Sequence, residues 1–201
     1  MIEEIKLGKH ITIYRVNFKD IDNEQLSKEL WYSTELSKTT HYPSKTEPGI
    51  QSDVLINSVN INLVRTKIIN LMFSLFDKPF FYGIQEWIFI SQNDNPYSGF
   101  HTHQNEYSVR KSKQKPDYTL TYYSKMPDNL EGDDGCIIFK DTDGEEFSIL
   151  PKEGDLILFG TDVLHRAATN TKSINDRIVF CTNFTFLDID KSYNKKQKTL
   201  I

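Results

Sequence analysis

The part of the chain that follows Phe80 consists of short strand-like runs with no helical pattern between them. Clusters of Asp, Asn, Gly and Pro separate these runs, as turns do between strands. Parallel strands need a long crossover, usually a helix, so the lack of helical patterns predicts an antiparallel sheet. The runs are FYGIQEWIFIS, YTLTYYSK, GCIIFKD, EEFSILP, GDLILFG and DRIVFCTNFTF.

Two helices are predicted before these strands. Residues 23–33 follow Asp22, a suitable N-cap, and place their leucines on one face. Residues 53–76 carry apolar side chains at helical spacing, and Pro79 ends this pattern. Helices followed by a run of strands predict an α+β domain, a β-sandwich or jelly roll with the N-terminal helices packed on one sheet.

The length of the chain, 201 residues, suits one domain with a substantial core. We therefore expect a single domain over residues 1–201. Residues 1–79 are expected to form a helical support region, residues 80–188 the β core, and residues 189–201 a charged, flexible tail.

The composition argues against several classes of protein. The net charge of −4 does not favour a nucleic-acid-binding surface. No segment approaches the ~20 apolar residues of a membrane span, and the N-terminus lacks the basic-then-apolar order of a signal peptide. Cys136 and Cys181 lie far apart in strand-like runs, which is typical of reduced, buried thiols. We expect a cytoplasmic protein that binds neither nucleic acid nor a membrane.

Two of the predicted strands have one apolar face and one face with small or polar groups. Because side chains alternate along a strand, Thr119, Thr121 and Tyr123 share a face of the first. Arg177 begins the corresponding face of the last strand. Burying a polar inner face is costly unless it lines a pocket. The alternation therefore predicts a ligand cavity.

The stretch GFHTHQNEYS contains His101 and His103, whose side chains would point the same way on an extended strand. His165, just after a strand in FGTDVLHRAA, is the best third partner. Two or three imidazoles with open positions beside them suit a non-haem Fe(II) ion. His10 and His41 are interpreted as ordinary loop residues.

Five elements, taken in order, resemble a known family. HTH, YTLTYYSK, GDDGCIIF, PKEGDLILFGTDVLH and DRIVFCTNF, within residues 87–186, resemble the double-stranded β-helix core of the Fe(II)- and 2-oxoglutarate-dependent oxygenases of the prolyl-hydroxylase-like superfamily. The likeness is closest to a bacterial and phage-type branch that carries HxH. The resemblance implies a dioxygenase that uses Fe(II), 2-oxoglutarate and O₂, hydroxylates its substrate, and releases succinate and CO₂.

The resemblance also implies a set of metal ligands. His101 falls at the first iron histidine, His165 at the distal one, and His103 where most members have an aspartate or glutamate. This departure leaves three alternatives. The ligands are all three histidines, or the pair shifts to His103 and Asn105, or Glu106 reaches the metal through a β-bulge. We favour the three histidines, with Glu106 as the alternate carboxylate.

The family likeness places the co-substrate as well. Arg177 matches the basic residue that pairs with the far carboxylate of 2-oxoglutarate, and Tyr123 matches a tyrosine that assists it, with Thr121 on the same face. A guanidinium offers a bidentate fork that suits a carboxylate. The alternative role for Arg177 is a surface salt bridge with Asp176.

The substrate is not indicated by the sequence; peptidyl proline and a small metabolite are both candidates. We interpret the region of Trp87, Tyr97 and Phe100 and the loop around residues 41–50 mainly as plain packing, with a wall of the substrate site as the alternative role of each.

Two other functions remain as alternatives. A cupin-type metalloenzyme would use an HxH, Glu and His site without 2-oxoglutarate. Cupins place their last histidine much closer to the turn glycine than His165 lies to Gly154, and Arg177 would have no role. The second alternative is a jelly-roll binding module that has lost its catalytic activity.

Overall fold

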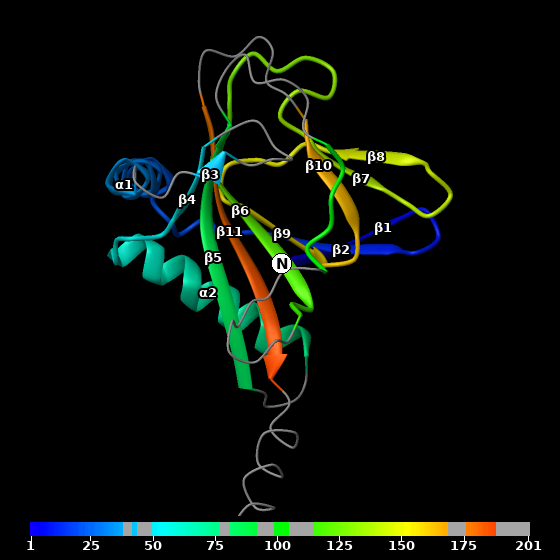
Figure 1. Cartoon of the computed structure of the whole chain (residues 1–201), viewed down its shortest axis with the longest axis horizontal. Helices are drawn as coiled ribbons and strands as arrows, with labels where there is room; N and C mark the ends of the chain where they lie inside the picture. Colours follow the sequence, from blue (N-terminus) through cyan, green and yellow to red (C-terminus); the bar gives the residue numbers. More distant parts are fainter. Residues whose placement is uncertain are drawn as a thin grey trace, which may run out of the picture.

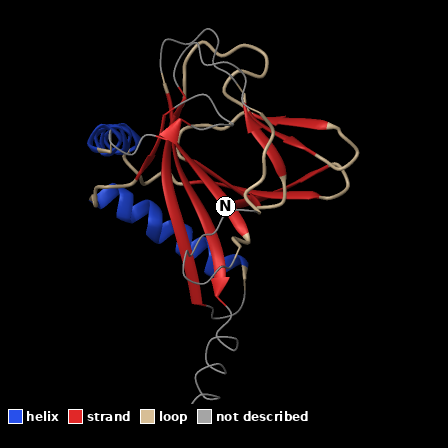
Figure 2. Cartoon of the chain, viewed as in Figure 1, coloured by secondary structure: helices blue, strands red, loops and turns tan. Residues whose placement is uncertain are grey.

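The computed structural model of the protein describes residues 1–37, 42–43, 50–76, 81–91, 99–104, 115–168 and 176–187. Two antiparallel sheets face one another, and two helices cover the outer face of the larger sheet (Figure 1). The larger sheet has the strand order β1-β2-β9-β6-β11-β5-β4-β3, and the smaller has the order β10-β7-β8. Figure 2 shows the same layers, with both helices on one side of the strands.

Strands β5 and β11, which pair with each other in the large sheet, are the longest, with 11 residues each. The large sheet contains β1 (Ile2–Leu7), β2 (Ile11–Asn17), β3 (Tyr42–Pro43), β4 (Ile50–Asp53), β5 (Phe81–Ser91), β6 (Tyr118–Lys125), β9 (Asp155–Gly160) and β11 (Arg177–Leu187). The small sheet contains β7 (Ile137–Lys140), β8 (Glu146–Ile149) and β10 (Leu164–Ala167).

Each helix is preceded by a residue whose side chain caps its N-terminus. Helix α1 (Asn23–Leu36) follows Asp22, whose side chain accepts a hydrogen bond from the backbone N–H of Gln25, so the predicted cap is confirmed. Helix α2 (Val59–Leu75) follows Ser58, which caps it in the same way. The second helix begins later than predicted because Ile50–Asp53 pairs with β5 as a strand.

Alternation along the central strands divides the interior into two clusters. On one face of the large sheet, apolar side chains of β6 and β11 pack against both helices. On the other face, Tyr123, Val179 and Cys181 belong to a second cluster, which lies between the two sheets. Both of the chain's cysteines are buried, and neither is in a disulfide.

The predicted fold class, an α+β double-stranded β-helix with helices on one sheet, is confirmed. The predicted helical support region also contains strands that were not predicted. Residues 2–17 form the β1–β2 hairpin, which extends the large sheet beside β9. The predicted tail over residues 189–201 lies outside the described residues. Neither described helix has the length and apolar character needed to cross a membrane.

Candidate metal centre

Backbone hydrogen bonds hold the HTH segment against the strand that carries His165. The backbone N–H of His101 donates to the carbonyl of His165, and the reverse bond is also made, both at 3.0 Å. The N–H of His103 donates to the carbonyl of Thr161, at 2.9 Å, in the turn after β9. This bridge sets the register between two segments far apart in the sequence, and it places the three histidines together.

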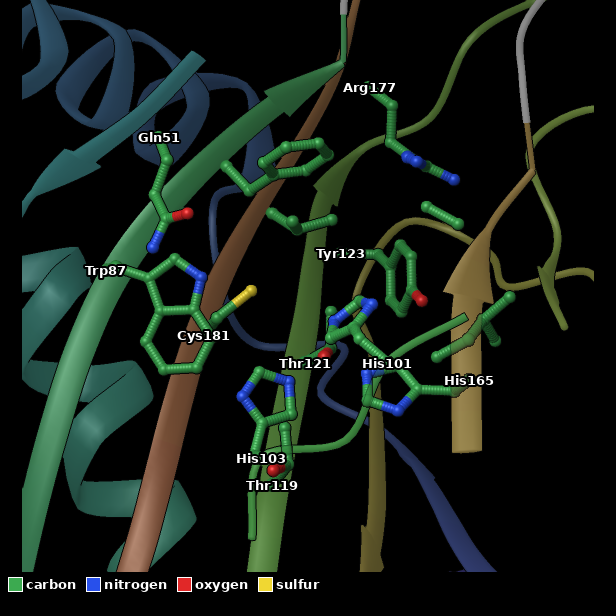
Figure 3. Close-up of a pocket in the computed structure, with 14 residues that line it drawn as sticks. Gln51, Trp87, His101, His103, Thr119, Thr121, Tyr123, His165, Arg177 and Cys181 are labelled. Carbon is green, nitrogen blue, oxygen red and sulfur yellow. The ribbon is translucent and has the colours of Figure 1, made fainter. Parts of the chain in front are cut away.

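The three imidazoles form one compact group. One ligand nitrogen from each of His101, His103 and His165 can be chosen so that all lie within 4.8 Å of one another. The side chains of His103 and His165 are buried, and His101 is partly buried. Figure 3 shows all three beside the same cavity. The structure therefore brings together the three histidines that the sequence singled out, and His10, which is exposed in a turn, lies outside this group.

Two of the rings are oriented by backbone carbonyls. The Nδ1 atom of His165 lies 2.9 Å from the carbonyl oxygen of Val163, and Nδ1 of His101 lies 3.2 Å from that of Gly99. A carbonyl can only accept, so each Nδ1 carries the proton and donates. In a neutral ring this leaves the lone pair on Nε2, which is the arrangement that metal-binding histidines commonly have.

The surroundings of His165 favour its neutral form. Burial lowers the pKa of His165 well below its usual value, and the neighbouring His101 and His103 lower it further. The ring also contacts the edge of Phe159, with 4.6 Å between centroids. Because a metal ion binds only the deprotonated imidazole, a low pKa prepares this side chain for coordination.

The donor set fits a transition-metal ion. Three imidazole nitrogens suit Fe, Zn, Cu or Ni, whereas Ca²⁺ and Mg²⁺ prefer oxygen ligands. Fe(II) is therefore compatible with these residues. Asn105 and Glu106, the two other residues considered as ligands, lie outside the described residues.

A cavity of about 100 Å³ lies next to the histidines, between the two sheets. It is lined by residues from six strands and from the HTH segment. Thr121, Tyr123 and Arg177, the residues expected to hold a co-substrate, all line it. Among the described residues, the lining consists of Gln51, Trp87, Phe89, His101, His103, Thr119, Thr121, Tyr123, Ile137, His165, Ala167, Arg177, Val179 and Cys181.

Arg177 is a buried cation without a counter-ion among the described residues. Its side chain is 2% exposed, and its Nη1 atom makes only long contacts, of 3.4 Å, with the carbonyls of Gly135 and Cys136. Its Nε atom is buried and has no hydrogen-bond partner within the described part of the chain. A buried guanidinium left unpaired is strongly unfavourable, so this side chain is suited to receive an anion.

The alternative role for Arg177, a surface ion pair with Asp176, does not fit this geometry. Arg177 is buried and lines the cavity, and no ion pair joins it to a carboxylate in the described ranges. Burial raises the pKa of Asp176, and Lys125 is the charge that opposes this rise.

The sequence matches no protein-family model and no curated protein. Solved structures do match in fold. A viral collagen prolyl hydroxylase from Paramecium bursaria Chlorella virus-1, in complex with 2-oxoglutarate, has a TM-score of 0.59 and 17% identity over 88% of this chain and 96% of that one. A Trichoplax adhaerens prolyl hydroxylase, in complex with a hypoxia-inducible-factor peptide, has a TM-score of 0.60 and 11% identity over 86% and 83% of the two chains. The fold is that of the Fe(II)- and 2-oxoglutarate-dependent oxygenases.

The same oxygenase fold accommodates other reactions. The 2-oxoglutarate-dependent epimerase SnoN of nogalamycin biosynthesis has a TM-score of 0.62 and 13% identity over 86% of this chain and 78% of that one. The resemblance read from the sequence is thus confirmed at the level of the fold. The fold does not select a substrate, which has to be inferred from the site.

The cavity includes one residue that the sequence did not single out. Gln51 lines the cavity from β4, but IQSD is too short to carry a strand pattern and was assigned to a loop and a helix. Trp87 lines the cavity as one candidate wall residue. Phe100 has a packing role: it lies against Arg166, with 5.0 Å between the guanidinium carbon and the ring centroid. Tyr97 and residues 44–49 of the other candidate wall lie outside the described residues.

Proposed function

We propose that the protein is an Fe(II)- and 2-oxoglutarate-dependent dioxygenase that hydroxylates an organic substrate. One observation carries the proposal: Arg177, which is buried without a counter-ion among the described residues, lines the same cavity as the three clustered histidines. When bound, Fe(II) and 2-oxoglutarate supply the oxidising chemistry, in which O₂ is consumed, 2-oxoglutarate becomes succinate and CO₂, and the substrate gains a hydroxyl group. Peptidyl proline and a small metabolite both fit this reaction class.

The polar residues of the lining would form two groups, one that holds the metal and one that holds 2-oxoglutarate. His101, His103 and His165 would hold the metal, each through a neutral ring nitrogen. Arg177 would bind the distal carboxylate of 2-oxoglutarate with its planar fork, which provides both the charge and the geometry for two parallel hydrogen bonds. The hydroxyl of Tyr123 would donate a hydrogen bond to the same carboxylate. Thr121 lies two residues before Tyr123 on β6 and also lines the cavity.

The apolar part of the lining has a separate task. Phe89, Ile137 and Val179 also line the cavity, and each is nearly inaccessible to solvent. Excluding water strengthens the attraction between Arg177 and a carboxylate and protects reactive species from side reactions.

The experiment that tests the proposal is a turnover assay. Fe(II)-loaded protein is incubated with 2-oxoglutarate and O₂, and succinate is measured alongside oxygen uptake. We expect slow conversion without a substrate and faster conversion once a substrate is present, and both should disappear in His165→Ala. Metal binding without any consumption of 2-oxoglutarate would favour the cupin-type alternative, and the absence of both would favour a binding module.

A further inference from the structure

A row of four paired residues crosses the cavity face of the large sheet. Thr121 of β6 lies opposite Cys181, which lies opposite Trp87, which lies opposite Asp53 of β4. Neighbouring strands are about 4.8 Å apart, so three such steps place Asp53 about 14 Å from Thr121 across the sheet. The first three residues line the cavity, and Asp53 continues their row at its outer end.

The side chain of Asp53 faces the cavity side of the sheet. Its neighbour Ser52 is buried on the helix face, where its hydroxyl lies 2.8 Å from that of Thr34 in α1. Alternation therefore directs Gln51 and Asp53 to the other face, and Gln51 does line the cavity. Residues paired directly across two strands have Cβ atoms about 4.5–5.5 Å apart, so the side chains of Asp53 and Trp87 are neighbours.

Asp53 is an exposed carboxylate without a counter-ion among the described residues. The one side chain that bonds to this residue, Ser33, donates to its backbone carbonyl at 3.4 Å. Strand β3 pairs only with Ile50 and Gln51, so no described strand covers the outer side of Asp53. Its negative charge can therefore attract a ligand.

Trp87 places an aromatic ring between this carboxylate and the metal centre. Trp87 is partly exposed, and its ring lies 5.5 Å from the ring of His103, measured between centroids, at an interplanar angle of 35°. The face of an indole attracts organic cations. An exposed ion pair alone contributes little, so the indole and the carboxylate of Asp53 would have to act together on the same cation.

The other side of the cavity carries the opposite charge. Figure 3 shows Arg177 and Tyr123 on one side, and Gln51 and Trp87 on the other. A dicarboxylate is attracted by Arg177 and repelled by Asp53, whereas a cation experiences the reverse. The two charges would therefore direct the co-substrate and a cationic substrate to different sides.

We propose that Asp53 and Trp87, with Gln51 beside them, form the substrate subsite, and that this subsite takes a small organic cation with an ammonium or guanidinium group. The inference rests on the proposed function, because the co-substrate must occupy the Arg177 side. The amide oxygen of Gln51 can accept a hydrogen bond from an N–H of such a group. A neutral molecule of the same shape lacks the attraction to both the carboxylate and the indole face.

Tryptophan fluorescence gives a direct test, because the chain has only two tryptophans, Trp31 and Trp87. Trp31 belongs to α1 on the opposite face of the large sheet, packed against the helix-side cluster, so Trp31→Phe leaves Trp87 as the single reporter. This variant is loaded with Zn(II) and 2-oxoglutarate, which prevents turnover. It is then titrated with two pairs of probes of equal shape. One pair is choline and its neutral analogue, in which a tert-butyl group replaces the trimethylammonium, and the other is n-butylguanidinium and n-butylurea.

We expect at least one of the two cations to change the emission of Trp87 saturably, with an affinity at least about fivefold above that of its neutral partner. A smaller difference in both pairs would overturn the inference, and so would the lack of a response to either cation. Omitting 2-oxoglutarate should weaken the cation, because the charge of the metal ion is then not offset. Tighter binding of the cation without 2-oxoglutarate would mean that the two compete for one place, which would also overturn the inference.

A separate titration with 2-oxoglutarate distinguishes the two levels of the argument. If 2-oxoglutarate fails to bind, the proposed function fails. If it binds and neither cation is preferred over its neutral partner, only the subsite is wrong.

One substitution assigns the preference to Asp53. Asp53→Asn keeps the size of the side chain and removes its charge, so it should lower the affinity for the cation about threefold and leave that for its neutral partner unchanged. The affinity for 2-oxoglutarate should not fall. Glu3→Gln, at an exposed position of the edge strand β1, is the matched control and should bind like the parent. If Asp53→Asn prefers the cation as strongly as this control does, Asp53 has no part in recognition and the inference is wrong.

Discussion

The two faces of the large sheet use the same strands for different purposes. On the helix face, the hydroxyl of Tyr122 donates to Oδ1 of Asn23 at 2.6 Å, and burial raises the pKa of Tyr122. The buried Oγ1 of Thr182 has no partner there among the described residues, but it belongs to a neutral hydroxyl group. On the cavity face, Arg177 is buried without a carboxylate among the described residues. The unpartnered group on the helix face is a neutral hydroxyl, whereas the one on the cavity face is a charged guanidinium that is suited to an anion. The comparison indicates that alternate residues of β6 and β11 serve stability and binding separately.

The largest effect is expected from a change on the helix face. Phe180 is fully buried against the helices, so Phe180→Ala should lower the free energy of unfolding by about 3–5 kcal/mol through lost burial and a cavity. Chemical denaturation measures this change. The folded fraction should still bind metal and 2-oxoglutarate normally. A large loss of affinity in that fraction would show that the two faces are not independent.

The next effect is expected at the metal ligands. His165→Ala removes one of three ligands, and because outer partners of such ligands alone change metal affinity 10–100-fold, we expect a loss of more than about 100-fold. Competition with a chromophoric chelator measures the affinity. His10→Ala, at an exposed turn, should leave it unchanged. Undiminished metal binding in His165→Ala would mean that the ligand set lies elsewhere, and loss of metal in Glu106→Ala would add that carboxylate to the set.

A third change removes the buried charge of the cavity face. Arg177→Leu should raise the Kd for 2-oxoglutarate about 30-fold or more, because truncating one partner of a buried charged pair is strongly unfavourable. Metal affinity should stay the same. In the absence of 2-oxoglutarate the melting temperature should be equal or higher, since an unpaired buried charge has been removed. Anaerobic titration of the Fe(II) protein, followed by its charge-transfer absorption, measures the Kd. Wild-type affinity in this variant would place the anchor elsewhere.

The smallest effect is expected from a single hydroxyl group. Tyr123→Phe removes one hydrogen bond to the far carboxylate, so the Kd for 2-oxoglutarate should rise about fivefold, near 1 kcal/mol. The same titration measures it. A loss as large as that of Arg177→Leu would mean that Tyr123, rather than the guanidinium, dominates the binding of the anion.

The features that the sequence predicted well belong to long, regular strands. The alternation in β6 and β11 predicted which residues face the cavity, because side chains on a strand have a fixed period of two. The HTH pair and His165 were recognisable as candidate ligands by residue type. Their convergence could not be read from spacing alone, because it depends on backbone bonds between residues 101 and 165.

The features that were missed lack such a pattern. Strand β1 reads IEEIKL, is largely exposed, and owes its structure to pairing with β2 rather than to an apolar face. Strand β4 has only four residues, so its alternation is too short to recognise, and Gln51 was missed with it. In both cases the tertiary context decides the structure, and no local signal encodes that context.

The reciprocal backbone bonds between His101 and His165 have a consequence for how the protein is assembled. They join segments separated by most of the β core and place the HTH segment beside β10, at the edge of the small sheet. Contacts between residues so far apart in the chain are slow to form, because the intervening loop must first be closed. A metal ion that binds all three histidines would therefore hold that loop closed, and uptake of the ion would report that the HTH segment has paired with β10.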